Sequence, residues 1–256
     1  MYLREVVRDG KCEVNGRHEN RGYRVRANDF LELHIDLTRE NAMQPEDVPL
    51  DIVFEDPHLI VVNKAAGMLV HPTHRDKAGT LLNALAHHLN PARNGTPAIR
   101  PGLIHRLDKQ TSGLIVVAKS DRVHRIIAKQ FQRKSVEKLY LALVRGNVKE
   151  HEGVIEAPIG RYPELKHWDI KSDGKPAVTR FRVRNRNTDT TLLELEPVTG
   201  RTNQLRIHCA HIGHPIVGDT KRGGGTAERL FLHAWRLTFR HPATNEPVSF
   251  TADPPF

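Results

Sequence analysis

The sequence predicts an α+β domain with a mixed, mainly antiparallel sheet, preceded by a small N-terminal appendage. Extended segments outnumber helical ones along the 256-residue chain. The few helical segments do not alternate regularly with the strands, which argues against a doubly wound parallel sheet. A chain of this length has room for one large domain and an appendage. We expect the appendage at 1–36, a linker at 37–49 and the main domain at 50–256.

The appendage is expected to hold a short helix and two extended pieces. Residues 2–9 fit a helix that ends at Gly10, and Asn15-Gly16 predicts a tight turn. Residues 30–36, FLELHID, alternate apolar and polar side chains, which is typical of a strand. This order resembles the second half of the S-four-type RNA-binding module, in which a helix and a following loop grip RNA. The module's first helix has no counterpart here, so we expect a partial RNA-binding appendage.

The first half of the main domain is predicted to contain three strands and two helices. They are two strands within 50–67, a helix after Gly79, a buried strand at 114–118 and a helix at 121–134. The first two strands are expected to join at Asp56-Pro57. The second helix places Val123 and Ile127 on one face, and Asp121 is its expected N-cap.

The second half is predicted to be mostly extended. Its elements are a strand at 137–146, a hairpin over 177–200 with its turn near 187–189, a helix at 201–213 and strands at 229–242 and 246–253.

The charge of the chain favours a polyanionic partner. The formal net charge is +9 and the sequence pI is about 9.8. Neutralising phosphates releases counterions, so a basic balance of this size favours nucleic acid. Residues 122–145 hold seven Lys or Arg and one acid, Glu137, and Arg182, Arg184 and Arg186 share one face of a strand. We expect phosphate contacts on both segments, although a solvated surface would explain either one alone.

Neither a membrane nor an oxidising compartment is indicated. No apolar run approaches the ~20 residues of a membrane span. The N-terminal residues carry charges where a signal peptide needs an apolar core. Two cysteines, Cys12 and Cys209, cannot build a disulfide framework. We therefore expect a cytoplasmic protein.

One stretch, HRLDKQTSG at 105–113, holds a single carboxylate between an arginine and a turn. Chemistry at a sugar or a base often uses a carboxylate as nucleophile or general base. Asp108 is the candidate, if an arginine keeps it ionised and the turn keeps it in place. The alternative is a structural ion pair beside a turn.

A second stretch, residues 198–219, can supply the cation. Arg201, Asn203 and Arg206 lie within six residues. On a helix, Arg206 can face a cleft while Leu205 forms part of the floor. Arg206 is therefore the expected partner of Asp108, and a basic surface helix is the alternative.

Two further features have an ordinary explanation beside a functional one. Tyr140, in a predicted strand, can stack on a flipped base or be a core aromatic residue. His208, Cys209, His211 and His214 have spacings that could suit zinc. The glutamate and the second Cys-x-x-Cys element of a zinc deaminase are missing, so we expect local hydrogen bonding there. We expect no metal and no nucleotide cofactor.

Taken in order, six stretches resemble the RluA family of pseudouridine synthases. They are VVNKAAGMLVHP, RPGLIHRLDKQTSGLIVVAK, EKLYLALVRG, GKPAVTRFRV, GRTNQLRIHCAHIGHPIVGD and LFLHAWRLTF. The resemblance runs from about residue 50 to the C-terminus, and HRLDxxTSG is highly specific to that family. It implies the family's fold and the isomerisation of uridine to pseudouridine in RNA, without a metal or a soluble cofactor.

The resemblance also implies roles for single residues. Asp108 matches the catalytic carboxylate, which either attacks the sugar or abstracts a sugar proton. Arg206 matches the basic residue that pairs with it, and Tyr140 matches the aromatic residue that stacks on the target base. Arg106 matches the arginine that fills the space left by the flipped nucleotide, and Leu205 matches an apolar wall. The expected RNA-contacting residues are Arg106, Leu205, Arg201, Asn203, Lys64 and His105.

The leading hypothesis is an RNA pseudouridine synthase that acts on structured RNA. Large-subunit ribosomal RNA is the expected target, and transfer RNA remains open. A second hypothesis is a non-catalytic RNA-binding or ribosome-assembly factor with the same fold, and a third is a metal-dependent hydrolase. The intact set of Asp108, Tyr140 and Arg206 favours the first. We expect a monomer without membrane association.

Overall fold

The computed structural model describes residues 6–19, 22–34, 44–73, 75–90, 99–164 and 167–256. The chain divides into two compact units, residues 1–41 and 42–256. Most of the predicted linker up to residue 43 lies outside the described ranges. Residues 44–49 have no regular secondary structure. They attach to the second unit, where Gln44 O accepts a hydrogen bond from the Asn83 side chain at 2.8 Å.

In the first unit, two short strands form an antiparallel pair. β1 (Cys12–Val14) pairs with β2 (Leu31–Leu33). Asn15 and Gly16 have φ angles of 52° and 74°, as a type I′ turn requires. The predicted turn and strands are confirmed. The predicted helix is visible over residues 6–8, and its beginning lies outside the described residues.

The second unit is built on one mixed sheet. Among the described residues, ten strands take part. Eight follow the order β3 (Ile52–Glu55), β4 (Leu59–Lys64), β6 (Ser112–Ala118), β13 (Leu232–Arg240), β7 (Glu137–Arg145), β12 (Thr190–Pro197), β11 (Val178–Arg186) and β8 (Glu152–Glu156). β5 (Gly102–Leu103) pairs with β6, and β14 (Pro247–Thr251) pairs with β13. Of the described pairings in this sheet, only β6 with β13 is parallel. The predicted mixed, mainly antiparallel α+β fold is confirmed.

The central strand β6 is buried on both faces because a helix contributes to the core on each. α3 (Asp121–Gln132) adds Ile127 to the cluster around Val116. α2 (Leu81–His88) adds Leu85 to the cluster around Ile115. A strand covered on both faces is expected to be a continuous apolar run, which explains the sequence of β6. No helix in the described part of the chain has the length and apolar composition needed to cross a membrane.

The start of α3 differs from the prediction by one residue. Ser120 is the N-cap, and its hydroxyl accepts a hydrogen bond from the Val123 N–H at 3.4 Å. Ser120 has extended backbone, with φ −150° and ψ 158°, as an N-cap does. Asp121 is instead the first helical residue, where its carboxylate interacts favourably with the positive end of the helix dipole.

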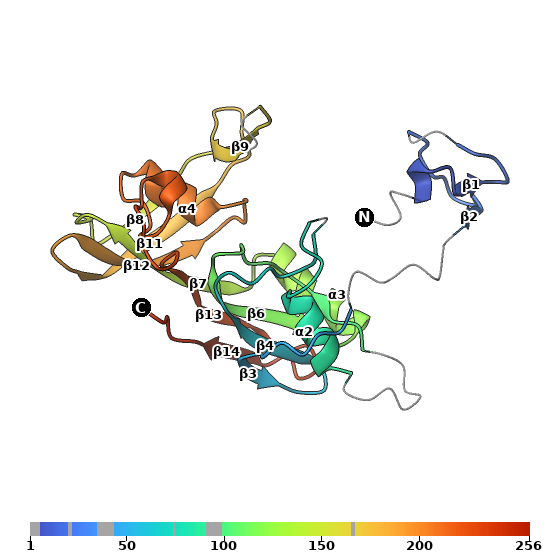
Figure 1. The fold of residues 1–256 in the computed structure, drawn as a ribbon, viewed down its shortest axis with the longest axis horizontal. Helices are drawn as coiled ribbons and strands as arrows, with labels where there is room; N and C mark the ends of the chain where they lie inside the picture. The colour runs from blue at the N-terminus through green and yellow to red at the C-terminus, as the bar shows by residue number, and fades with distance from the viewer. Residues whose placement is uncertain (1–5, 20–21, 35–43, 74, 91–98, 165–166) are drawn as a thin grey trace. The chain divides into compact units, whose positions relative to one another are not determined.

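The other half of the sheet carries α4 (Gln204–His211), which shares a core cluster with Leu193 and Leu195 of β12. η1 (Thr220–Arg222) follows α4, and the β9 (Ile159–Tyr162) and β10 (His167–Ile170) hairpin adjoins it. Figure 1 shows β7 and β13 running between this half and the half that carries α2 and α3. The sequence analysis missed β5, β8, β9 and β10, because strands of two to five residues leave no clear periodicity.

Candidate active site

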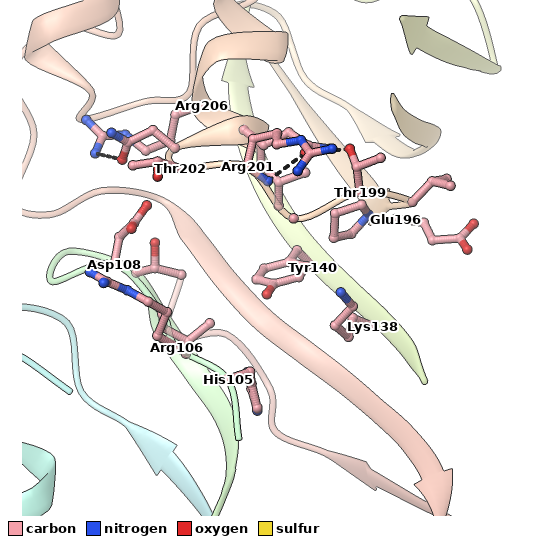
Figure 2. A pocket seen from close by; sticks show the side chains of 18 of the residues that line it. His105, Arg106, Asp108, Lys138, Tyr140, Glu196, Thr199, Arg201, Thr202 and Arg206 are labelled. Atoms are coloured by element: carbon pink, nitrogen blue, oxygen red, sulfur yellow. Dashed lines mark hydrogen bonds between the residues drawn. The ribbon is translucent and has the colours of Figure 1, made fainter. Parts of the chain in front are cut away.

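A cavity of about 830 Å³ lies between the two halves of the sheet. Most of its lining comes from the loop before β6, the end of α3, strand β7, and the connection from β12 into α4; Trp168 of β10, Arg180 of β11 and Leu232 of β13 also contribute. Figure 2 shows the side chains of Asp108, Tyr140 and Arg206 in this cavity. The volume falls within the range of ligand-binding clefts. The fold therefore brings together the three residues that the sequence analysis singled out.

Asp108 lies in a turn whose backbone is held from two sides. The Asp108 carbonyl accepts a hydrogen bond from the Thr111 N–H at 3.1 Å. The next carbonyl, that of Lys109, accepts one from the Gly67 N–H at 2.8 Å and one from Lys64 Nζ at 3.3 Å. The Asp108 carboxylate has no hydrogen bond or ion pair within the described chain. It points towards Thr202 and Arg206 in Figure 2, so its position is fixed while its oxygens stay available.

Lys64 acts as an internal anchor for that turn. Only 1% of the residue is exposed. Its ammonium donates to the carbonyls of Ala65 at 2.7 Å, Met68 at 2.9 Å and Lys109 at 3.3 Å. Burial lowers the pKa of Lys64 to about 8, against an opposing effect of the Asp108 charge. The expectation that Lys64 contacts RNA is therefore wrong for this structure: the ammonium is buried and its three donors are used.

Arg206 pairs with Asp219 rather than with Asp108. Its Nε and Nη2 donate to the two Asp219 carboxylate oxygens, both at 2.7 Å, and Nη1 donates to Asn203 Oδ1 at 3.2 Å. The Asp219 side chain is only 1% exposed, and a buried carboxylate requires such a partner. Hydrogen bonding to Asp219 raises the pKa of Arg206, and the charge of Asp108 adds to the effect. The expected direct pair is corrected to an interaction of charges across the cavity.

Tyr140 and Leu205 supply apolar surface in the cavity. Tyr140 lies in the middle of the sheet, where β7 pairs with β12 and β13. Leu205 is 8% exposed and belongs to the core cluster against which Tyr140 packs. Burial raises the pKa of Tyr140 above its usual value of 10, and the Asp108 charge adds to this. The phenol is therefore neutral at physiological pH and offers a ring face and a hydroxyl.

The connection into α4 is organised by the buried side chain of Gln204. Its Oε1 accepts hydrogen bonds from the Thr199 hydroxyl at 2.7 Å and the Arg201 N–H at 3.0 Å. The Arg201 guanidinium donates to Pro176 O at 3.0 Å, and the residue lines the cavity. Asn203 has left-handed backbone, with φ 55° and ψ 21°, and its side chain serves Arg206 instead of capping the helix. Arg201 and Asn203 both line the cavity, and their expected contact with RNA stays a prediction.

His105 and Arg106 differ in their availability. His105 Nε2 accepts a hydrogen bond from the Val116 N–H at 3.1 Å, and its ring stacks on Phe131 with centroids 4.8 Å apart. Burial lowers the pKa of His105 to about 3, so the ring is neutral and ties the loop to β6 and α3. Arg106 is exposed, lines the cavity and lies beside Asp108 in Figure 2. Arg106 can therefore reach a ligand, whereas His105 presents only part of its ring.

The histidine-rich stretch of α4 does not converge on one point. His208 Nε2 bonds the Ala157 carbonyl at 3.0 Å. Cys209 is fully buried, and burial raises the pKa of its thiol to about 12. Within the described ranges, no group of three or more His, Cys, Asp or Glu side chains is placed to hold a metal ion.

The two expected phosphate surfaces carry different charge patterns. On β11, Arg182 pairs with Glu152 at 3.4 Å and Arg184 pairs with Glu194. That strand presents both signs, so its arginines are already engaged. The exposed cations of α3 and its C-terminal end have no ion pair within the described chain; they are Arg122, Arg125, Lys129, Arg133 and Lys134. The α3 surface is therefore the better match to a polyanion.

Asp219, which holds Arg206, and Lys138, which lines the cavity, are two residues that the sequence analysis missed. Asp219 ends the run GHPIVGD, and nothing in that run shows that its carboxylate is buried. Lys138 precedes Tyr140 by two residues, which places both on the same face of β7. For neither residue does the sequence alone show which groups its side chain contacts in the folded chain.

The fold matches solved structures of pseudouridylate synthases. Human RNA Pseudouridylate Synthase Domain Containing 1 superposes with a TM-score of 0.65 and 27% identity, over 86% of this chain and 87% of that chain. Human RNA Pseudouridylate Synthase Domain Containing 4 has the same TM-score at 24% identity, over 80% and 88%. The fold, with its cleft beside the central strands, defines a pseudouridylate synthase domain.

Sequence relatives identify the family. A family model described as RNA pseudouridylate synthase matches residues 58–211. An Aquifex aeolicus protein described as an uncharacterized RNA pseudouridine synthase is 36% identical over 99% of this chain and 85% of its own length. Ribosomal large subunit pseudouridine synthase D of Vibrio parahaemolyticus is 36% identical over 99% and 82%, and that of Zymomonas mobilis is 39% identical over 91% and 78%. The chain belongs to the RNA pseudouridylate synthase family. It is an enzyme that isomerises uridine to pseudouridine in RNA.

Proposed function

We propose that the enzyme modifies a uridine of large-subunit ribosomal RNA and that Asp108 starts the reaction. One observation carries the catalytic assignment: the Asp108 carboxylate, which has no partner among the described residues, lines the same cavity as Tyr140 and Arg206. The ribosomal target is supported by the names of the Vibrio and Zymomonas relatives. A non-catalytic assembly factor is not favoured, because such a factor would have no use for this set of side chains in one cavity.

The reaction exchanges one bond for another between the same two fragments. The N1–C1′ bond of uridine breaks, the uracil turns, and a C5–C1′ bond forms. C5 loses a proton and N1 gains one, so the product has the composition of the substrate. Asp108 either attacks C1′ or removes a ribose proton to start the cleavage, and it is released unchanged at the end. Both routes need an ionised carboxylate in a fixed position, which the turn at Thr111 and the Lys64 anchor supply.

The target base must leave the RNA stack, because C1′ and C5 are inaccessible inside a helix. We propose that the extruded uracil stacks on Tyr140, with Leu205 as the opposing apolar wall. The neutral phenol suits this role, since base–aromatic stacking contributes about 1–3 kcal/mol. Arg106, exposed beside Asp108, is placed to fill the space that the base leaves.

Arg206 contributes charge without blocking the nucleophile. Asp219 holds the guanidinium through two hydrogen bonds of 2.7 Å. The charge of Arg206 therefore acts on Asp108 only across the cavity, while the Asp108 oxygens remain open to the ribose. A contact pair would have occupied those oxygens.

The remaining parts are assigned to RNA binding. Arg201 and Asn203 border the cavity, and the exposed cations of α3 extend the basic surface. Residues 1–36 are proposed as a partial RNA-binding module. We propose that the enzyme acts as a monomer, since a single chain brings Asp108, Tyr140 and Arg206 into one cavity. We place the enzyme in the cytoplasm, where ribosomal RNA of bacteria is modified.

Pseudouridine mapping tests the target. Pseudouridine has the same mass as uridine, so total RNA is labelled chemically in cells that have the gene, lack it, or carry only the Asp108→Asn form. We expect one or more sites in large-subunit ribosomal RNA to vanish without the gene and to stay absent with Asp108→Asn. Loss confined to transfer RNA would reject the ribosomal target. Rescue of the sites by Asp108→Asn would reject the catalytic assignment.

A further inference from the structure

Lys138 is half-buried and presents to the cavity an ammonium that has no partner in the part of the chain that the structure describes. It lies on β7, two residues before Tyr140 and on the same face. Figure 2 shows Tyr140 between Lys138 and Asp108 in that view, with the Lys138 ammonium directed into the cavity. Within the described chain the ammonium has no hydrogen bond and no ion pair. The ammonium lies over the Phe131 ring, 5.8 Å from the centroid.

The neighbouring acid, Glu196, forms no ion pair with Lys138 in the described chain. Glu196 also lines the cavity and favours the charged form of Lys138. Its carboxylate, however, is paired with Arg180 at 3.2 Å. Burial lowers the pKa of Lys138 from its usual value. Burying a cation without a partner is unfavourable. The Lys138 ammonium is therefore expected to bind an anion that comes from outside the protein.

We propose that Lys138 binds a backbone phosphate of the RNA adjacent to the flipped uridine. The inference rests on the proposed function, in which the uracil stacks on Tyr140. Two residues along a strand span about 7 Å, a separation that a ribose and its phosphate can bridge. Lysine is a compact point charge with three rotatable donors, which suits a phosphate whose orientation changes while the uracil turns. Lys138 would hold the RNA backbone at one end of the cavity, while Asp108 acts on the uridine at the other end.

The test compares Lys138→Met with Lys149→Met. Lys149 is exposed and does not line the cavity, so it is a matched control for the loss of one lysine charge. Both changes are made in the Asp108→Asn enzyme, and its affinity for an unmodified large-subunit ribosomal RNA transcript is measured from low to high salt. Binding measured in this way needs no turnover. The test can therefore fail while the catalytic proposal stands, and the reverse also holds.

We expect Lys138→Met to weaken binding about tenfold at low salt, as loss of one charge-assisted contact does. The slope of log affinity against log salt should become shallower by about 0.7–0.9, the contribution of one phosphate. Lys149→Met should change neither quantity. Lys138→Arg should keep the slope of the parent enzyme. With Asp108 restored, KM should rise about tenfold while kcat changes less than about twofold.

A slope that is unchanged by Lys138→Met would overturn the proposal, as would an equal change in Lys149→Met. If Lys138→Met does not fold, amine labelling of the parent enzyme decides the question. Lys138 should react with a small acylating reagent in the free protein and be protected when the ribosomal RNA transcript is bound. Equal labelling with and without that RNA would contradict a phosphate contact.

Discussion

The buried carboxylate of Asp219 determines where the Arg206 guanidinium lies. Asp219 is nearly inaccessible and takes two of the Arg206 donors. The sequence analysis assigned Arg206 to Asp108 because both are charged and both fall in matching motifs. The structure shows why Asp219 takes precedence: the half-buried Asp108 carboxylate faces a cavity that water can enter, whereas the buried Asp219 carboxylate needs a protein partner. Arg206 therefore forms hydrogen bonds with Asp219 and interacts with Asp108 only through its charge.

This arrangement predicts that Arg206 and Asp219 act as one unit. Arg206→Lys keeps the charge but loses the planar fork that matches the carboxylate, so we expect turnover to fall at least tenfold. The turnover of Asp219→Asn should fall by a similar factor, because the Arg206 guanidinium then loses the carboxylate that holds it. The double variant should lose little more than either single one. Single-turnover formation of pseudouridine measures all three.

Arg182→Lys is the control for that series, since it alters an exposed pair on β11 with Glu152. We expect it to be near wild type, because exposed pairs contribute about 0–1 kcal/mol. Losses that add fully between Arg206→Lys and Asp219→Asn would show two independent roles and would contradict the single unit.

Tyr140 provides a second prediction at this scale. Tyr140→Phe keeps the ring and removes only the hydroxyl, whereas Tyr140→Ala removes the stacking face. We expect the phenylalanine form to retain at least tenfold more activity than the alanine form, consistent with about 1–3 kcal/mol per stacked base. Initial rates at saturating RNA measure the difference. Equal losses in the two variants would instead point to a role of the hydroxyl in proton transfer.

At the scale of elements, long patterns could be predicted and short strands could not. The β6 sequence is a continuous buried run of seven residues, while the amphipathic face of α3 and the hairpin of β11 with β12 repeat a clear period over eight or more residues. β5 has two residues, and β9 and β10 have four each. These short strands form because they pair with strands from other parts of the chain, so no local sequence pattern predicts them.

The site could be predicted as a set of residues but not as a set of contacts. Asp108, Tyr140, Leu205 and Arg206 are brought together as expected. Lys64 was expected to contact RNA, but the residue is buried. Its burial follows from three carbonyls that only the folded chain brings around one ammonium. Such partners come from remote segments, so composition and spacing cannot name them.

The loop before β6 makes a prediction about pH. Burial holds the pKa of His105 at about 3, below its ordinary value of 6.5. Between these values the unfolded chain binds a proton that the folded chain does not, so acid lowers the free energy of unfolding. From pH 6.5 to pH 5 the loss is up to about 2 kcal/mol. Urea unfolding at both pH values should show this loss in the wild type and a smaller one in His105→Gln, whose amide can still accept the Val116 hydrogen bond.

His151→Gln serves as the matched control, because His151 is exposed. It should keep the pH dependence of the wild type. If His105→Gln also keeps the full loss, His105 is not the group that couples folding to acid, and the anchoring role of its ring fails.

At the scale of the whole molecule, the two units predict separable contributions. Residues 42–256 contain the sheet, its core clusters and the whole cavity. Deleting residues 1–41 should therefore leave a folded catalytic unit whose melting temperature changes by only a few degrees. Affinity for structured large-subunit ribosomal RNA should fall about tenfold, with the basic surface of α3 retaining the rest. Calorimetry and filter binding measure the two effects. A truncated chain that cannot fold would show that residues 1–41 are structural packing.

The account as a whole depends on the carboxylate of Asp108, and Asp108→Asn tests it most directly. The change keeps the shape of the side chain and removes its charge, while the RNA surfaces and the Arg206–Asp219 pair are untouched. Chemical labelling or nucleoside chromatography would measure pseudouridine in large-subunit ribosomal RNA treated with each form, alongside RNA affinity. We predict no detectable pseudouridine with Asp108→Asn and an affinity near that of the wild type. Pseudouridine formed at the wild-type rate would contradict the assignment of this site and the mechanism built on it.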